Sequence, residues 1–455
     1  MEKAQKMAAA IAADGAGSPF PFSSVIFCNI GNPQQLGQAP LSFVRHVLAA
    51  SAMGKGPGSE AVRAVLPADA VARADRYLAE ARSIGAYSAS QGLTSVREDV
   101  ADFLRRRDGD KVATADNVHL TDGASVGVKA VLSVLIRDAD DGILIPIPQY
   151  PLYSASIAML GGTAVNYYLE EESGWSLSVD EVDRAYEEAT ARGTTVRAIA
   201  IINPGNPTGQ VLDRDNISAI LKWASRRQVA VLADEVYQVN VYEEGREFVS
   251  FRRVALEDKC ADVPLFSFHS TSKGVIGECG LRGGYLDVLN VHESVEAQLR
   301  KLSSVSLCSN LVGQLAVGCM VRPPVEGDES FATYAAEHAA LLQGLRERSQ
   351  LVATTLNALP GIHTQPAAGA MYLFPTIVLP AGAVKEAERR KISPDTLYCM
   401  SLLEETGIVV VPGSGFGQRD GTFHFRTTFL PQADQMAQVA ERFAKFHGEF
   451  MEKYE

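Results

Sequence analysis

A lysine and an arginine nine residues apart are the first residues whose types and spacing suggest chemistry. Lys273 follows an alternating apolar run that ends in small hydroxyl residues, Phe266 to Ser272, and Arg282 stands nine positions further on. The run predicts a strand entering a tight turn, so the lysine should project from a rigid base. A lysine amine acts as a Schiff-base nucleophile towards a carbonyl when its surroundings favour loss of its proton. A solvated lysine in a serine-rich turn is the alternative for this segment alone.

A second candidate lies where a short strand meets a helix. Val118 to Thr121 predicts a strand, Asp122-Gly123-Ala124-Ser125 its turn, and Val126 to Leu135 an apolar helix. Such a junction presents free backbone N–H groups and the positive end of a helix dipole, which suit a phosphate. The stretch matches neither the Walker loop nor the dinucleotide-binding glycine pattern, so an ordinary capped helix is the alternative.

An aromatic ring and a polar turn follow. Tyr150 lies between Pro148 and Pro151, which stiffen the loop and could hold the ring as a flat face for stacking; a ring packed at a strand end is the alternative. The β-branched run Val196 to Ile202 stops in an Asn-Pro-Gly-Asn-Pro-Thr-Gly stretch over 203–209. This pattern predicts a buried parallel strand that ends in a rigid turn.

A carboxylate and a phenol end the next strand candidate. Val229 to Ala233 predicts another buried strand, and Asp234 and Tyr237 come directly after it. Ligands of open α/β sheets bind at the carboxyl edge of the strands, so both side chains are site candidates. An aspartate that merely caps the loop is the alternative for Asp234.

The order of the elements predicts an α/β fold. Strand and helix candidates alternate from about residue 117 to 275, which indicates a mostly parallel sheet covered by helices on both faces. The chain turns helical beyond about 295 and closes in a mixed α+β segment. We expect an N-terminal arm and part of a small domain over 1–75, a large cofactor-binding domain over 76–335 and a C-terminal small domain over 336–455. Within the first part, 14–40 predicts an extended arm and 59–83 a helix.

Bulk composition excludes several classes of function. The 455 residues suffice for two domains, and the 46% apolar and 21% charged residues are ordinary for a globular enzyme. The net charge of -12 and the pI near 5.3 argue against nucleic-acid binding and against an anionic membrane surface. No apolar window approaches 18 residues, so we expect no membrane span.

Cysteine usage and the N-terminus bear on the compartment. The six cysteines are scattered without metal-ligand spacing, which favours reduced intracellular thiols over disulfides or a zinc site. Lys3 and Lys6 precede a weakly apolar alanine-rich run that resembles a signal peptide only faintly. We expect a cytoplasmic protein, with a mitochondrion or another organelle as the alternative.

One ligand would use all of these groups. Pyridoxal 5'-phosphate brings an aldehyde for a lysine, a phosphate for an anion pocket with an arginine, and a flat ring for an aromatic face. Its phenolic oxygen needs donors such as an asparagine and a tyrosine, and its ring nitrogen needs a carboxylate. We therefore expect this cofactor and no metal site.

The same residues, in the same order along the chain, match a known family. The series of motifs around Tyr87, Asp122 to Ser125, Tyr150, 203–209, 234–237, 270–273 and Arg282 resembles fold type I aminotransferases over about residues 20 to 450. The stretches at 31–38 and 277–285 are more narrowly similar to the alanine aminotransferases among them. The resemblance implies a large domain with a mostly parallel sheet of the seven-stranded type and a smaller α+β domain.

The resemblance implies a role for each matched residue. Lys273 would hold the cofactor covalently and, once released, carry a proton between substrate and cofactor. Asp234 would pair with the ring nitrogen, and Tyr150 would stack on the ring. Asn206 and Tyr237 would donate to the phenolic oxygen. The implied phosphate ligands are Ala124, Ser125, Ser270, Ser272 and Arg282.

The resemblance also implies substrate contacts and a partner. Arg426 matches the arginine that clamps the substrate α-carboxylate, with Asn206 beside it, and Gly31 and Asn32 lie where the N-terminal segment closes over the substrate. Tyr87 matches a tyrosine that reaches the cofactor phosphate of a neighbouring subunit. This implies a homodimer with shared active sites.

The implied reaction is a reversible ping-pong transamination. L-alanine would leave as pyruvate, and 2-oxoglutarate would carry the amino group away as L-glutamate. A glutamate:glyoxylate aminotransferase and a 1-aminocyclopropane-1-carboxylate synthase-like lyase are rivals in the same architecture. A non-catalytic regulatory domain that senses the cofactor is the rival of another class, and it would be expected to carry a basic DNA-binding module.

Overall fold

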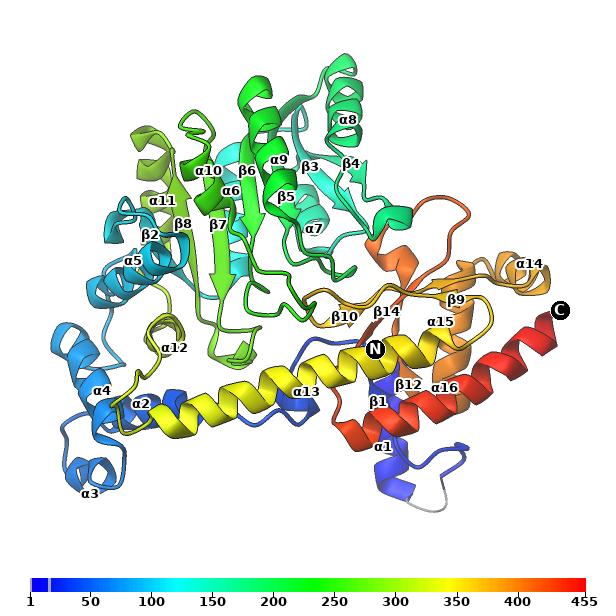
Figure 1. Cartoon of the computed structure of the whole chain (residues 1–455), viewed down its shortest axis with the longest axis horizontal. Coiled ribbons are helices and arrows are strands. Elements are labelled where there is room, and N and C mark those ends of the chain that lie inside the picture. Colours follow the sequence, from blue (N-terminus) through cyan, green and yellow to red (C-terminus); the bar gives the residue numbers. More distant parts are fainter. Residues whose placement is uncertain (1, 15–17) are drawn as a thin grey trace.

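The computed structural model describes residues 2–14 and 18–455, and a seven-stranded sheet lies at its centre (Figure 1). The strand order is β2-β8-β7-β6-β5-β3-β4, and the strands pair in parallel except β8, which runs antiparallel to both neighbours. The strands are β2 (Val118–Thr121), β3 (Asp141–Ile147), β4 (Thr163–Tyr168), β5 (Thr195–Ile202), β6 (Ala230–Asp234), β7 (Leu265–Ser270) and β8 (Gly284–Leu289). The mostly parallel sheet predicted from the sequence is therefore confirmed.

Helices cover both faces of this sheet because its strands are apolar on both sides. In β5, Ile199 and Ile201 pack against one apolar cluster, whereas Ala198, Ala200 and Ile202 pack against another. The first cluster contains residues of α8 (Val179–Ala191), α9 (Arg214–Arg227) and α10 (Phe251–Glu257). The second contains residues of α6 (Ala124–Leu135), α7 (Leu152–Leu160) and α11 (Glu293–Val305).

Two further helices close the β2 end of the sheet. These are α5 (Thr94–Asp108) and α12 (Leu311–Val321), which share an apolar cluster with Leu120 and Tyr285. A polar contact joins α12 to the α6 turn, because Oδ1 of Asp122 accepts hydrogen bonds from the backbone and the side chain of Asn310 at 2.8 and 2.7 Å. Asn310 thus anchors the turn at the start of α6 through two hydrogen bonds.

The N-terminal part of the chain contributes helices and one short strand. They are α1 (Glu2–Asp14), β1 (Ile26–Phe27), α2 (Ser42–Met53), α3 (Ser59–Arg63) and α4 (Ala68–Ala81). α1 buries Ala4 and Met7 beside Leu403, a helix that the sequence analysis did not expect. The single helix expected over 59–83 is instead two, since residues 64–67 break it and Pro67 caps α4.

A smaller α+β region follows the large sheet. Its elements are α13 (Phe331–Asn357), β9 (Ile362–His363), β10 (Tyr372–Leu373), β11 (Thr376–Ile377), α14 (Ala381–Arg390), α15 (Pro394–Thr406), β12 (Ile408–Val409), β13 (Val411–Pro412), β14 (Phe425–Thr428) and α16 (Ala433–Tyr454). β1 pairs with β12, so the N-terminal arm joins this region. The long helix α13 runs from beside α2 at one end to α16 at the other (Figure 1).

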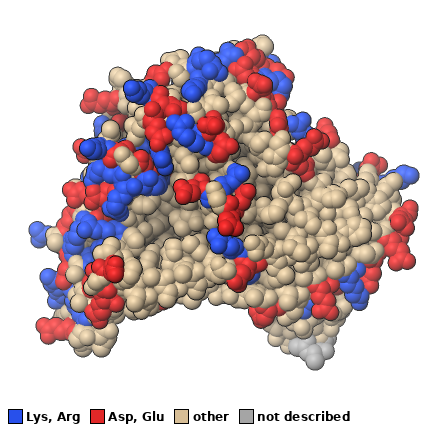
Figure 2. Space-filling view, viewed as in Figure 1, with Lys and Arg blue, Asp and Glu red and all other residues tan. Residues whose placement is uncertain are grey.

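The surface carries both signs of charge, as the composition leads one to expect. Lysine and arginine side chains alternate with aspartate and glutamate over the large-sheet region, so no field of a single sign covers the face shown in Figure 2. Among the described residues, no helix combines the length and the apolarity that crossing a bilayer requires. The domain limits at 75 and 335 remain a prediction, although α13 does begin near the second of them.

Candidate active site

A cavity of about 400 Å³ lies at the carboxyl edge of β5, β6 and β7 and reaches the N-terminal arm and β14. This volume is typical of small-molecule sites. The cavity is lined by all but one of the candidate residues: Gly31, Asn32, Ala124, Ser125, Tyr150, Asn206, Asp234, Tyr237, Ser270, Ser272, Lys273, Arg282 and Arg426. Parallel neighbours bring these groups together because consecutive strands end at the same edge of the sheet.

Lys273 extends from the turn after β7 to the N-terminal arm, where its Nζ donates to the backbone oxygen of Gly31. Hydrogen bonds fix the turn on either side of it. Thr271 N donates to Gly283 O at 3.1 Å, and Gly274 N donates to Oδ1 of Asn240 at 2.9 Å. Gly274 has a φ of 68°, which a residue with a side chain adopts only at a cost. The amine therefore stands on a rigid base, as the sequence predicts.

Asp234 ends β6 as a buried carboxylate. Tyr153 Oη donates to its Oδ2 at 3.0 Å, and the backbone N of Val236 donates to its Oδ1 at 3.4 Å. Burial raises the pKa of Asp234 to about 6, although these two donors and the charge of Lys273 act in the opposite direction. A positive partner would favour the charged carboxylate, so the group is suited to a protonated ring nitrogen.

The start of α6 and Arg282 form the anion-binding end of the cavity. α6 has no side-chain cap, and the amides of Ala124 and Ser125 find no acceptor among the described residues. Arg282 Nη2 donates to Asp122 O at 3.1 Å and to Ser125 Oγ at 3.4 Å. Free amides at a helix start, together with a guanidinium, make a phosphate site.

Arg426 on β14 also lines the cavity and is 7% exposed. Its Nη1 donates to Oδ1 of Asn206 at 3.1 Å, and its Nη2 donates to the backbone oxygen of Asn29. Its Nε is buried and has no hydrogen-bond partner in the described part of the chain. Asn206 Nδ2 in turn donates to Tyr237 Oη at 3.5 Å. A buried guanidinium with an unused donor is suited to an incoming carboxylate.

The sequence matches the family model for aminotransferase class I and II over residues 58–443. The chain belongs to the class I and II aminotransferase family. This family uses pyridoxal phosphate, so the cofactor expected from the sequence is confirmed, as is the fold type I architecture.

Named relatives align with almost the whole length of this aminotransferase. A probable mitochondrial alanine aminotransferase from Dictyostelium discoideum is 49% identical over 438 residues, which are 95% of this chain and 82% of the relative. Glutamate–glyoxylate aminotransferase 1 from Arabidopsis thaliana is 46% identical over 435 residues, 95% of this chain and 90% of the relative. The solved alanine aminotransferase from Pyrococcus furiosus superposes with a TM-score of 0.74 at 25% identity, covering 99% of this chain and 98% of that one.

The cavity fits the cofactor of this family. It offers an amine, a buried carboxylate with a raised pKa, and free helix amides beside an arginine. Tyr150 lines the wall with its ring 43% exposed and therefore able to face a planar ligand. No group of three or more potential metal ligands was found among the described residues.

Sequence reasoning missed two tyrosines of the site. Tyr153 contacts Asp234, and it follows Tyr150 by three residues, so the motif at 148–153 could have pointed to it. Tyr372 lines the cavity, and its Oη accepts a hydrogen bond from Tyr237 Oη at 3.4 Å. Burial raises the pKa of Tyr372, but the charges of Lys273 and Arg426 outweigh burial and lower it overall.

Tyr87 is the one candidate residue outside the cavity. It lies on the loop before α5, and its side chain is 76% exposed in the single chain. The expected contact with a neighbouring subunit remains a prediction.

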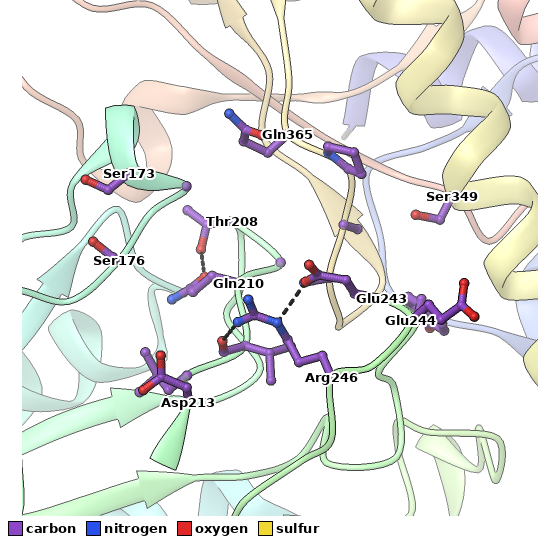
Figure 3. A pocket seen from close by; sticks show the side chains of 18 of the residues that line it. Ser173, Ser176, Thr208, Gln210, Asp213, Glu243, Glu244, Arg246, Ser349 and Gln365 are labelled. Carbon is purple, nitrogen blue, oxygen red and sulfur yellow. Dashed lines mark hydrogen bonds and ion pairs between the residues drawn. The ribbon is translucent and has the colours of Figure 1, made fainter. Parts of the chain in front are cut away.

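A larger hollow of about 810 Å³ lies elsewhere, between the 208–216 segment and the 346–350 turn of α13 (Figure 3). Its polar lining includes Glu243, which pairs with Arg246, and Gln210, which accepts from Thr208. The described residues that line this hollow include no lysine. From the 203–209 turn that carries Asn206, Thr208 and Gly209 line this hollow. The candidate catalytic residues line the smaller cavity instead.

Proposed function

We propose that this protein is an alanine aminotransferase, which reversibly transfers the amino group of L-alanine to 2-oxoglutarate and yields pyruvate and L-glutamate. The observation that carries the proposal is one cavity that holds the Lys273 amine between a buried carboxylate, Asp234, and the Arg426 guanidinium. Relatives with this name are 45–49% identical over nearly the whole chain, which supports the choice of substrate.

The cofactor residues divide into an anion pocket and a ring site. Ser270, Ser272, Arg282 and the first amides of α6 would bind the phosphate, because they are the donors at that end of the cavity. Asp234 would hold the proton on the ring nitrogen, and Asn206 and Tyr237 would donate to the phenolic oxygen. When bound, the ring supplies an electron sink for the substrate α-carbon.

Lys273 would move the proton. Among the described residues its amine is the only lysine nitrogen lining the cavity, and it donates to the backbone oxygen of Gly31 on the N-terminal arm. An amine in this position would take a proton from the substrate α-carbon and deliver it to the cofactor carbon on the other side of the transferred nitrogen. Asp234, Tyr237 and Lys273 together are the proposed catalytic residues.

Arg426 would orient the substrate. A bidentate arginine–carboxylate contact fixes the α-carbon relative to the lysine, and this is the orientation contribution to catalysis. Nη1 of this arginine also donates to Oδ1 of Asn206, and Gly31 and Asn32 line the same cavity. The α-carboxylate common to both substrates would therefore bind at the same place in both half-reactions.

A glutamate–glyoxylate aminotransferase is the second candidate, since a relative with that name is 46% identical over 95% of this chain. Both activities share the α-carboxylate clamp and differ in the keto acid. The cations that line the cavity are Lys273, Arg282 and Arg426, and all three already have proposed partners. The distal carboxylate of 2-oxoglutarate thus has no assigned cation in the described part of the chain. Initial rates with alanine and either 2-oxoglutarate or glyoxylate separate the two activities.

The aminocyclopropane-carboxylate lyase is a weaker candidate and releases no keto acid from alanine, so pyruvate formation excludes it. The named relatives are aminotransferases, which argues against the non-catalytic regulatory candidate.

The proposed assembly is a homodimer with shared active sites, supported by the exposed Tyr87 on its loop. The proposed compartment is the cytoplasm, although the Dictyostelium relative is named mitochondrial. Microscopy of a tagged full-length chain decides the compartment, and light scattering of the purified protein decides the assembly.

One spectral experiment tests the proposed activity. The purified protein should be yellow, its absorbance should be bleached by L-alanine with release of pyruvate, and 2-oxoglutarate should restore it with release of glutamate. Lys273→Ala should abolish turnover and remain folded. Measurable amino transfer by that variant, or a wild-type spectrum that does not respond to alanine, contradicts the proposal.

A further inference from the structure

Tyr372 reaches the substrate end of the cavity from the small region of the fold. It lies on β10, whose residues pair antiparallel with β14, and it stands opposite Thr428. Side chains two positions apart on a strand share a face, so Tyr372 and Arg426 are diagonal neighbours across the two strands. A short ladder of backbone hydrogen bonds therefore sets the position of the ring relative to the guanidinium.

The ring of Tyr372 stacks against the Arg426 guanidinium. The Cζ atom of Arg426 is 4.2 Å from the centroid of the Tyr372 ring and 4.7 Å from that of Phe416. Contacts at these distances are favourable cation–π interactions, and they are stronger away from water. Because both rings are buried, they restrict the plane that the guanidinium adopts.

The hydroxyl of Tyr372 makes a separate and weaker set of contacts. Its Oη accepts a hydrogen bond from Tyr237 Oη at 3.4 Å and lies against the backbone of Gly31. Around the same guanidinium, Nη1 binds Asn206 and Nη2 binds Asn29, while Nε is left without a partner. The plane set by the ring thus decides where the unused donor points.

We propose that Tyr372 is a positioning residue for the carboxylate clamp. Its ring sets the plane of the Arg426 guanidinium and, through it, the orientation in which the α-carboxylate of an amino-acid or keto-acid substrate binds. The inference rests on the proposed function, because only there does Arg426 bind a substrate carboxylate. Bidentate recognition depends on the plane of the fork, so a guanidinium free to tilt binds a carboxylate less tightly.

The test compares loss of the ring with loss of the hydroxyl. Propionate is alanine without its amine, so it binds at the clamp of the holoenzyme without reacting, and the change in cofactor absorbance reports its dissociation constant. Tyr372→Leu should weaken propionate binding about tenfold and raise the KM for alanine in step, as expected for loss of a buried cation–π contact. Tyr372→Phe keeps the ring and should stay within about threefold of the wild type.

Two further variants calibrate the result. Arg426→Leu should abolish propionate binding, which shows that the probe reports the clamp. Tyr186→Leu removes a tyrosine ring 4.8 Å from the Arg227 guanidinium, outside the cavity, and should leave propionate binding unchanged. If Tyr372→Leu does not fold, Tyr372→Met fills more of the space and carries the same expectation.

The outcomes separate the inference from the proposed function. A Tyr372→Leu enzyme that binds propionate as tightly as the wild type overturns the inference, and so does a Tyr372→Phe enzyme as weak as Tyr372→Leu. A wild type that binds propionate but exchanges no amino group with alanine overturns the proposed function instead.

Discussion

Tyr153 on α7 donates a hydrogen bond of 3.0 Å to Oδ2 of Asp234 on β6, and both side chains are buried. The contact crosses from a helix on one face of the sheet to the end of its central strand. Because the donor stabilises the charged carboxylate, it opposes the effect of burial on the pKa of Asp234. The group proposed to hold the ring-nitrogen proton therefore depends on a phenol outside the cavity lining.

We expect Tyr153→Phe to weaken cofactor binding. Loss of a hydrogen bond to a charged group costs ~1.5–3 kcal/mol. Because this bond also exists without cofactor, only part of that energy enters binding, and the dissociation constant of pyridoxal phosphate at pH 7 should rise by less than the roughly 10- to 100-fold that the whole energy would give. Absorbance titration of the apoenzyme measures this constant. Tyr167→Phe is the matched control, because that buried phenol donates to Ala200 O at 2.9 Å away from the cavity. An equal loss in both variants would contradict a specific role for Tyr153.

The stabilisation that the cofactor confers should depend on pH through Asp234. Its pKa is raised from 3.8 to about 6 in the folded chain without cofactor. Between these two pH values the folded state therefore keeps a proton on Asp234 that the unfolded state has released. This contribution to stability is complete below pH 3.8 and is lost as the pH rises past 6, to a total of roughly 3 kcal/mol. A positively charged ring nitrogen reverses the preference and favours the carboxylate.

The increase in melting temperature on adding cofactor should therefore be larger at pH 7 than at pH 5. Asp234→Asn cannot titrate and should lose this part of the pH dependence, while the titration of the cofactor phosphate remains in both proteins. The same pH dependence in wild type and Asp234→Asn would rule out the assignment. Differential scanning fluorimetry of the four protein and pH combinations, with and without cofactor, gives the answer.

Shared active sites make a prediction for mixed subunits. If Tyr87 acts on the partner's site, a heterodimer of Lys273→Ala and Tyr87→Phe chains contains one site with both native residues. Unfolding and refolding an equal mixture should then recover about a quarter of the wild-type activity, since half of the dimers are mixed and half of their sites are intact. A mixture of Lys273→Ala and Asp234→Ala should recover none, because both residues serve the same site. Activity no higher than the two separate variants would place Tyr87 outside the neighbouring site.

The parts of the site that follow strands could be predicted from the sequence. β2 occupies Val118–Thr121 as expected, β5 ends just before the turn that carries Asn206, and β6 ends at Asp234 itself. Each buried strand is marked by an apolar run, and each run stops in residues that cannot continue it. Strand ends in a parallel sheet then meet at one edge without further information.

Other parts depend on contacts that no local pattern carries. Tyr372 lies on a two-residue strand, too short for any periodicity, and its neighbours come from the segment after β6 and from β14. The reversed direction of β8 follows from pairing across the sheet, since Gly284–Leu289 is buried along its whole length just as the parallel strand β7 is. The helix α1 forms where Ala4 and Met7 meet Leu403, a surface 400 residues away in the chain.

Gly31 allows a final prediction, because it leaves no room for a side chain. A Cβ atom there would lie 1.9 Å from Tyr372 Oη and 2.8 Å from Lys273 Nζ, well inside van der Waals contact. Gly31→Ala therefore has to push the arm away from the lysine and open the cavity wall. A displacement of about 1 Å at a catalytic group costs about a hundredfold in rate, so kcat/KM for alanine should fall by that order. Gly56→Ala is the control, since the nearest atom there is 4.0 Å away, and it should leave kcat/KM unchanged. A Gly31→Ala enzyme with native kcat/KM would show that the arm does not seal the cavity during turnover.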